Sequence, residues 1–217
     1  MANLRLNQLT KRQRRQYFLT ADRIALARPE RTKKQWQFVS LLLAPDHVLR
    51  FQRLLRELEH LQSLPSTPIN RFRRLVTYRA YRRLGVLLGF SIPPSVFGPG
   101  LSIAHVGTIV VNKGARVGAN CRLHTCVNIG TAAGERHAAP TIGDNVYIGP
   151  GAKIFGPVRI ANGCAIGANA VVNRSFDQPN RLIAGVPARD CGEVDTATML
   201  IRATELLDGE PPVSQTR

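Results

Sequence analysis

Cysteine is scarce in this chain, and long apolar runs are missing. The four cysteines, at positions 121, 126, 164 and 191, form no Cys-x-x-Cys pair, so we expect no zinc or other metal site. The basic stretch at residues 11–15 follows no apolar segment, which is unlike a secretory signal, and no run is long enough to cross a bilayer. These absences favour a reduced, cytoplasmic compartment.

Acidic residues are also few, since 14 Asp and Glu stand against 30 Lys and Arg and give a formal net charge of +16. Such a charge favours an anionic partner: nucleic acid, an acidic membrane surface or a phosphorylated ligand. The sequence has no helix-turn-helix pattern and no aromatic-interleaved RNA motif, so we expect no specific nucleic-acid binding.

Most of the positive charge precedes residue 90, and six arginines lie between residues 71 and 83. We favour a solvated helix face for this stretch, because helical apolar partners account for its spacing. The alternative is a peripheral contact with an anionic membrane surface.

Residues 1–89 have the pattern of a basic helical region. Asp46 is a candidate N-cap for a helix that Pro65 and Pro68 end. Its apolar stripe, spaced by three and four residues, consists of Val48, Phe51, Leu54, Leu55, Leu58 and Leu61. A second helix is expected over residues 69–84, loosened at its end by Gly85 and Gly89.

Residues 90–190 follow a different pattern, in which aliphatic residues recur every six positions. The repeating positions are Val111, Val117, Leu123 and Ile129, and then Ile142, Ile148, Ile154, Ile160, Ile166 and Val172. A period of six suits a triangular solenoid, in which each short strand forms one wall and its aliphatic residue points inward. The sequence therefore predicts a mainly β protein, a parallel β-helix after a small helical region. Residues 191–217 are expected to form a tail with a short helix near residues 197–207.

The repeat is interrupted in two places. Thirteen residues separate Ile129 from Ile142, so residues 131–140 should loop out from a corner and carry Arg136 and His137. An earlier set, Phe97, Ile103 and Ile109, runs two residues out of phase with Val111, and His105 lies beside this slip. Insertions on a rigid scaffold often carry function.

Four segments resemble the serine acetyltransferase branch of the hexapeptide acyltransferases. They are residues 98–111 (GPGLSIAHVGTIVV), Arg136-His137, residues 148–154 (IGPGAKI) and residues 184–189 (AGVPAR). The resemblance implies a left-handed coil and a homotrimer, or a dimer of trimers, with active sites between neighbouring chains. It implies acetyl-coenzyme A as donor, His105 as general base, and His137 and Arg136 at the acceptor site. A non-catalytic scaffold is a remoter alternative.

Further site residues are expected around these histidines. Lys113 and His124 are candidates for acceptor binding. The coenzyme A groove is expected along the coils after the loop, where small residues let a pantetheine arm approach the backbone. Its candidates are Gly130, Thr131, Gly149, Pro150, Gly151, Ala168 and Arg189.

The chain departs from the serine enzymes at three positions where they carry carboxylates. Phe90, Ala104 and Lys113 stand there instead. An ammonium group without a counter-charge is costly to desolvate, so these changes favour a saccharide hydroxyl of the capsule or exopolysaccharide type as acceptor. Serine is the alternative acceptor.

Overall fold

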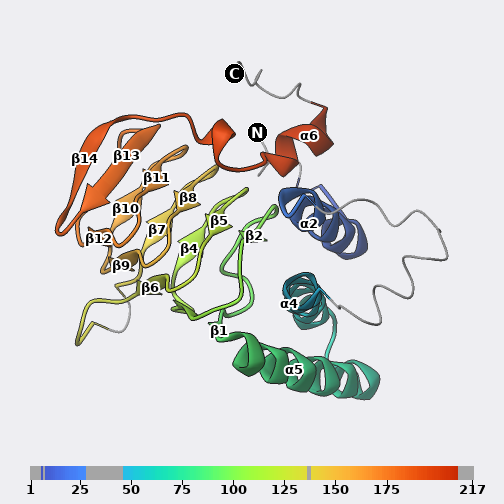
Figure 1. The fold of residues 1–217 in the computed structure, drawn as a ribbon. Coiled ribbons are helices and arrows are strands. Elements are labelled where there is room, and N and C mark those ends of the chain that lie inside the picture. Colours follow the sequence, from blue (N-terminus) through green and yellow to red (C-terminus); the bar gives the residue numbers. More distant parts are fainter. Residues whose placement is uncertain (1–5, 7, 28–45, 136–137, 210–217) are drawn as a thin grey trace.

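The computed structural model describes residues 6, 8–27, 46–135 and 138–209 (Figure 1). It shows a parallel β-helix with three helices packed beside its first coils. The helical region and the hexapeptide pattern that the sequence predicts are both present.

Helix α2, Lys11–Ala25, begins at a capping box in which Thr10 and Gln13 bond each other's backbone N–H groups. Sequence reasoning did not locate this helix. Helix α4, His47–Ser63, begins at Asp46, whose carboxylate accepts a hydrogen bond from the Leu49 N–H at 3.0 Å. The stripe predicted on α4 is buried, with Leu54 packing at its margin, and the helix ends before Pro65.

Helix α5, Pro68–Leu88, extends one turn beyond the expected end. Gly85 does not loosen it. A Cβ at this position would lie 2.8 Å from the Phe90 carbonyl oxygen, so glycine instead allows close packing of the helix against the first strand. The helix ends at Gly89, which adopts the left-handed conformation with φ of 77°.

Fourteen short strands build three walls of the β-helix. Wall A contains β1 (Phe90–Ser91), β3 (Ile109–Val111), β6 (Asn128–Gly130), β9 (Lys153–Phe155) and β12 (Val171–Val172). Wall B contains β4 (Arg116–Val117), β7 (Thr141–Ile142) and β10 (Arg159–Ile160). Wall C contains β2 (Ser102–Ile103), β5 (Arg122–Leu123), β8 (Tyr147–Ile148), β11 (Ala165–Ile166), β13 (Arg181–Gly185) and β14 (Ala188–Glu193). All pairs are parallel except β13 with β14, which form a hairpin.

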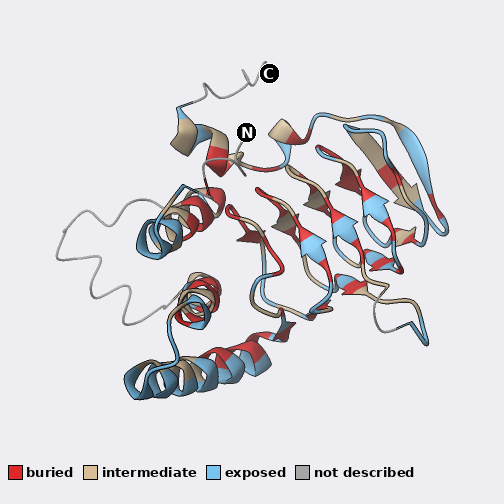
Figure 2. Cartoon of the chain, turned by 180° about the vertical axis from the view of Figure 1, so that it is seen from behind, coloured by how far each residue is buried: buried red, intermediate tan, exposed pale blue. Residues whose placement is uncertain are grey.

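The aliphatic ladder points inward, as the period of six predicts (Figure 2). Ile148, Ile154 and Ile166 are fully buried, and Ile160 is 3% exposed. Regular coils are eighteen residues long, since Val111 pairs with Ile129. Asparagines at one corner, Asn120, Asn145 and Asn180, turn the chain with φ of 55°, 58° and 56°.

Both interruptions of the repeat are accommodated at corners. Ile129 pairs with Ile154, twenty-five residues on, because the loop of residues 131–140 adds seven residues to that coil. Ile103 pairs with Leu123, twenty residues on, so two extra residues fall between wall C and wall A of the first coil. Ile109 and Val111 are both buried there, which absorbs the phase slip that the sequence shows.

The C-terminal segment returns to the helices. The predicted short helix is a single 3-10 turn, Thr196–Thr198, followed by α6, Ala203–Asp208. Strand β14 runs across residue 190, where the tail was expected to begin. Ala203 of α6 packs against Ala21 and Ala25 of α2, which brings both ends of the described chain together (Figure 1). Within the described residues, no helix is long and apolar enough to span a membrane.

A buried ion cluster holds the helices against the first coil. Arg56 is paired with Asp22 at 2.8 Å and with Glu59 at 3.0 Å, and it donates to the carbonyl oxygens of Phe97 and Gly98. Burial alone would lower the pKa of Arg56, but the two carboxylates outweigh that effect and raise the pKa. Arg56 is therefore charged and held by α2, α4 and the β-helix together.

We predict that Arg56→Ala lowers the free energy of unfolding by about 3–5 kcal/mol, because it leaves the buried carboxylate of Asp22 and the partly buried carboxylate of Glu59 without their cation. Urea unfolding followed by circular dichroism measures this loss. Arg53→Ala, on the exposed face of the same helix, is the control and should change stability by less than about 0.5 kcal/mol. Equal effects of the two substitutions would show that the cluster contributes nothing specific.

Candidate functional site

One edge of the β-helix collects most of the predicted site residues. We call it the histidine edge; it is the corner where wall C turns into wall A, at residues 104–108, 124–127, 149–152 and 167–170. Successive coils are stacked there by hydrogen bonds from the Gly151 N–H to the Thr125 oxygen at 2.9 Å and from the Asn169 N–H to the Pro150 oxygen at 2.8 Å. His105, His124, residues 149–151 and Ala168 therefore lie along one column.

The two histidines of this edge face each other. His105 is exposed on the two-residue slip of the first coil, and its ring centroid lies 6.0 Å from that of His124. The ring of Tyr147 lies 5.1 Å from His124 on the other side. Three coils thus present a row of three rings, with His105 at its open end, where an exposed imidazole can reach a substrate hydroxyl.

His124 is the perturbed member of the row. Burial of its imidazole lowers the pKa of His124, and the neighbouring charges of Arg122 and His105 add to the effect. Its Nε2 atom is buried and has no hydrogen-bond partner among the described residues. His124 is therefore a neutral ring that packs beside His105.

The lower part of the histidine edge is lined by small residues. Gly151 has φ of 76°, and a Cβ there would lie 1.9 Å from the Asn169 side-chain oxygen, so only glycine fits. Ala168, on the next coil, is exposed. The edge leaves backbone groups accessible to a narrow ligand.

Three other candidates lie on a different corner, which we call the loop edge, where wall A turns into wall B. Lys113 lies there beside Gly130 and Thr131, since the Asn112 N–H bonds the Ile129 oxygen at 2.7 Å. Strands β3, β6 and β9 separate the two edges (Figure 1). A single chain therefore does not bring Gly130 and Thr131 to the same column as Gly149 and Ala168.

The remaining candidate residues do not lie among the described residues of the histidine edge. Arg136 and His137 lie outside the described residues. Arg189 is exposed in β14, paired across the hairpin with Ala184, which follows the last inward residue of wall C. Across the described parts of the chain, no three His, Cys, Asp or Glu side chains are grouped as a metal site would need.

Tyr147 is a neighbour of the site that sequence reasoning missed. It immediately precedes the inward Ile148, and it pairs in register with Arg122, which precedes the inward Leu123. Counting the seven-residue insertion into the coil length places Tyr147 beside Arg122, two residues before His124, whose ring it contacts.

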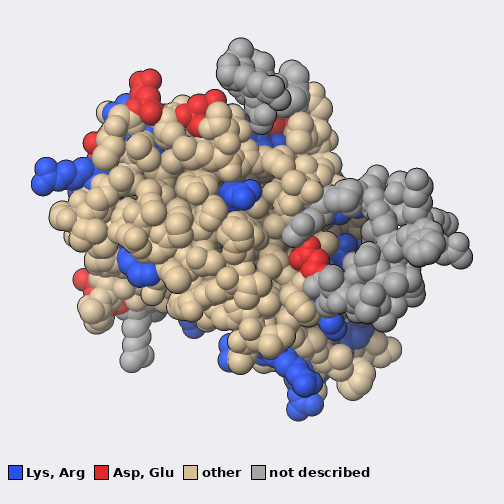
Figure 3. All heavy atoms as spheres, in the orientation of Figure 1, with Lys and Arg blue, Asp and Glu red and all other residues tan. Residues whose placement is uncertain are grey.

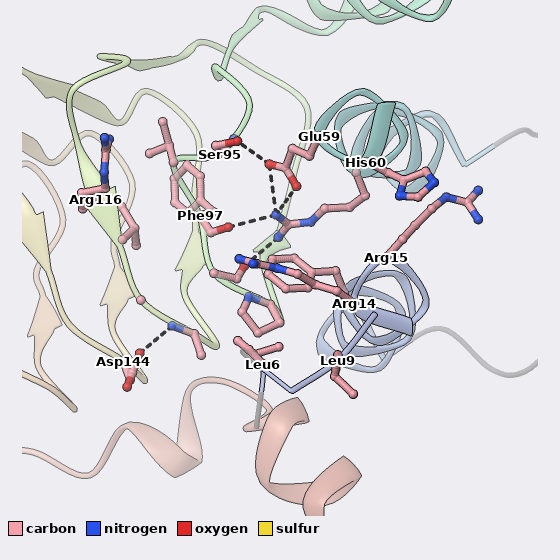
Figure 4. A pocket seen from close by; sticks show the side chains of 18 of the residues that line it. Leu6, Leu9, Arg14, Arg15, Glu59, His60, Ser95, Phe97, Arg116 and Asp144 are labelled. Carbon is pink, nitrogen blue, oxygen red and sulfur yellow. Dashed lines mark hydrogen bonds and ion pairs between the residues drawn. The ribbon is translucent and has the colours of Figure 1, made fainter. Parts of the chain in front are cut away.

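A cavity of about 870 Å³ lies away from this edge, between α2, α4 and wall B (Figure 4). Figure 4 shows the Arg56 cluster at its wall, with Glu59 also accepting from the Ser95 N–H at 2.7 Å. Lys11, Arg14 and Arg116 give it a basic lining. The cavity contains none of the predicted site residues.

The three positions without carboxylates are spread through the structure. Phe90 is buried, with its ring edge-on to Phe51 at 5.1 Å. Lys113 is exposed on the loop edge, away from His105 in the same chain. Within one chain, only Ala104 adjoins the catalytic candidate.

Comparison with known proteins identifies the repeat. Residues 139–174 match the family described as bacterial transferase hexapeptide (six repeats). Serine acetyltransferase from Mycobacterium tuberculosis is 36% identical over 124 residues, which is 55% of this chain and 53% of that protein. Serine acetyltransferase from Escherichia coli K12 is 33% identical over 131 residues, 58% of this chain and 47% of that protein. The chain spans about half the length of these curated relatives.

Solved structures agree with the sequence comparison. A crystal structure of serine acetyltransferase from Brucella abortus in complex with coenzyme A has a TM-score of 0.63 and 27% identity, covering 82% of this chain and 68% of that one. The β-helix of this chain is thus a hexapeptide-repeat transferase fold whose homologues are serine acetyltransferases.

These relatives correct the expectation of a saccharide acceptor. Relatives with 33% and 36% identity are named serine acetyltransferase, and they favour the serine alternative. The expectation relied on residue types alone at three positions, and one of these, Phe90, belongs to the core and cannot face an acceptor within this chain.

We predict that His124 titrates below its ordinary pKa of 6.5 in the folded protein. Between the lowered pKa of the folded protein and the ordinary pKa of the unfolded chain, the unfolded chain binds more protons at this group. The contribution of His124 to the free energy of unfolding is therefore fully present above about pH 6.5 and is lost as the pH falls through this window. NMR titration of the imidazole and urea unfolding from pH 5 to 8 measure both effects. His124→Gln should remove this part of the pH dependence. Titration of His124 at or above 6.5 would contradict the assignment.

Proposed function

We propose that this chain is an acetyl-coenzyme A-dependent serine O-acetyltransferase with His105 as its general base. The observation that carries the proposal is an exposed histidine, on an open edge lined below by small residues, in a hexapeptide β-helix whose relatives are serine acetyltransferases. A scaffold without catalysis would not require an exposed imidazole at this corner.

The reaction needs one proton transfer and no covalent intermediate on the protein. His105 accepts the proton of the serine hydroxyl as its oxygen attacks the thioester carbonyl. The new C–O bond forms, the C–S bond breaks, and the imidazolium returns the proton to the departing thiolate. Backbone N–H groups are the natural donors for the tetrahedral oxyanion.

The acetyl donor is proposed to lie along the histidine edge. Gly149, Gly151 and Ala168 present little side-chain volume there, and the pantetheine arm needs close contact with backbone groups. The exposed Arg189 lies beyond them at the end of wall C, where a guanidinium can meet a phosphate. The Brucella abortus relative is in complex with coenzyme A, which supports coenzyme A as the ligand.

Serine also needs a carboxylate for its ammonium group, because an unpaired ammonium is costly to desolvate. Glu135 is the only acidic residue of the loop at residues 131–140, and it is exposed beside Arg136. We propose that Glu135 receives the ammonium and that Arg136 receives the serine carboxylate. His137 completes the acceptor site in this proposal.

The two edges meet only if copies of the chain assemble. The loop with Glu135 and the exposed His105 lie on different corners of one β-helix, with wall A between them. We therefore propose a homotrimer of left-handed β-helices in which the loop edge of one chain faces the histidine edge of the next. Closed rotational symmetry makes three equivalent sites from one interface.

We predict that His105→Ala lowers kcat by about 10²–10⁴-fold with little change in coenzyme A binding, because only proton transfer is lost. Coenzyme A release from acetyl-coenzyme A and serine measures turnover, and calorimetry measures binding. Ala168→Trp is the complementary variant. It should block coenzyme A binding by filling the groove while the circular dichroism spectrum stays unchanged. Serine-dependent release at the wild-type rate in His105→Ala would show that this histidine is not the base.

We predict that Glu135→Gln raises KM for serine about tenfold and leaves KM for acetyl-coenzyme A unchanged, because it removes one charged contact to the ammonium. Steady-state kinetics with each substrate varied in turn measures the two constants. Glu193→Gln, at an exposed acid of the β14 strand, is the matched control and should leave both unchanged. Equal changes in both KM values would place Glu135 outside the acceptor site.

A further inference from the structure

Helix α5 has a composition unlike the other helices. Its 21 residues include six arginines and no acidic residue. Figure 3 shows basic side chains over α5 at the lower edge of the view, whereas the acidic side chains visible there lie elsewhere. The helix has no role in the proposed acetyl transfer, so its surface needs a separate explanation.

Among the described residues, only one face of α5 is packed against the rest of the protein. Tyr81, Leu84 and Leu88 are buried against α4 and the first strand. The other side exposes large apolar side chains, each between 49% and 76% accessible: Ile69, Phe72, Leu75, Val76, Tyr78, Val86 and Leu87. Exposed apolar groups in this number mark a contact with something outside the described chain (Figure 2).

The exposed apolar and basic residues share one side of the helix. Ile69, Phe72 and Val76 follow one another at spacings of three and four, and Arg79, Arg83 and Val86 continue the same row. Arg79 and Arg83 are exposed and make no hydrogen bond or ion pair to any residue that the structure describes. Arginine stems lie along an apolar surface while their guanidinium groups reach polar partners.

Charge decides between the candidate partners of this face. If α5 packed against α5 of a second copy, the contact would bring six more arginines and no carboxylate, so like charges would repel. Nucleic acid would pair the arginines but would leave Phe72, Val76 and Val86 without an apolar partner. An anionic bilayer supplies both headgroup charge and an apolar layer below it.

We propose that α5 lies in the plane of an anionic lipid surface, with Ile69, Phe72 and Val76 in the acyl boundary and Arg79, Arg82 and Arg83 at the headgroups. The helix then attaches the protein peripherally to the membrane. The exposed row of α5 contains none of the residues placed in the acetyltransferase site, so vesicle binding and acetyl transfer can be measured separately.

The test uses the full chain and sedimentation with vesicles. We expect binding to vesicles of phosphatidylcholine with 30% phosphatidylglycerol at least about tenfold tighter than to pure phosphatidylcholine, and weaker in 0.5 M salt. Arg79→Glu with Arg83→Glu should lower the partition coefficient at least about tenfold. The same double charge reversal at Arg12 and Arg53, which are exposed on α2 and α4, is the matched control. It should lower the partition coefficient by less than about threefold, which is half of the tenfold effect in free energy.

A second measurement separates insertion from simple adsorption. With Trp36→Phe removing the single tryptophan, Phe72→Trp places a reporter on the exposed face of α5. Its emission should shift to the blue with anionic vesicles and be quenched by brominated lipid, whereas Phe155→Trp on the β-helix should show neither effect.

Three outcomes would overturn the proposal. One is equal binding to neutral and anionic vesicles, or none to either. The second is loss of an oligomer in light scattering when Phe72 and Val76 become serine, which would make the face an interface between copies. The third is α5-dependent binding to duplex DNA at 150 mM salt without vesicle binding.

Discussion

The structure depends on one buried guanidinium. Arg56 joins α4 to Asp22 of α2 and to the carbonyl oxygens of Phe97 and Gly98, while Asp22 accepts hydrogen bonds from the N–H groups of Gly100 and Leu101, both at 2.9 Å. These backbone groups belong to the first coil, which has no preceding coil to pair with. The end of a solenoid exposes unpaired polar groups and must be capped. The ion cluster provides that cap and fixes the helices to the β-helix.

The capped solenoid explains why the site is on a corner and not in a cleft. Wall residues are used for pairing and for the inward ladder, and only corners tolerate extra residues without loss of register. The two-residue slip places His105 outside the packed ladder but on a rigid base. Small residues below it, such as Gly151, keep the same edge open over three coils. The rigid coils thus fix the position of His105, and the extra residues at the corner expose it to solvent.

Local pattern was enough to predict the repeat and the two long helices, because burial repeats with a fixed period in both. It could not predict the Arg56–Asp22 pair, whose members are 34 residues apart, or the packing of Tyr147 on His124. It also assigned the acceptor from residue types alone, although one of the three positions, Phe90, belongs to the core. Which residues share an edge depends on coil length, and the insertion changes that length.

The small number of carboxylates in the helical region affects both the Arg56 cluster and the surface of α5. In the helical region, each acidic residue that the structure describes is engaged: Asp22 and Glu59 by Arg56, Glu57 by Arg15 and Arg73, and Asp46 at the start of α4. These contacts leave no described carboxylate for Arg79 and Arg83. Among the described residues, Glu57 pairs with Arg73 of α5, while Arg79 and Arg83 stay at the surface beside apolar side chains without a carboxylate partner. In the proposal, an external anionic partner with an apolar interior covers this surface.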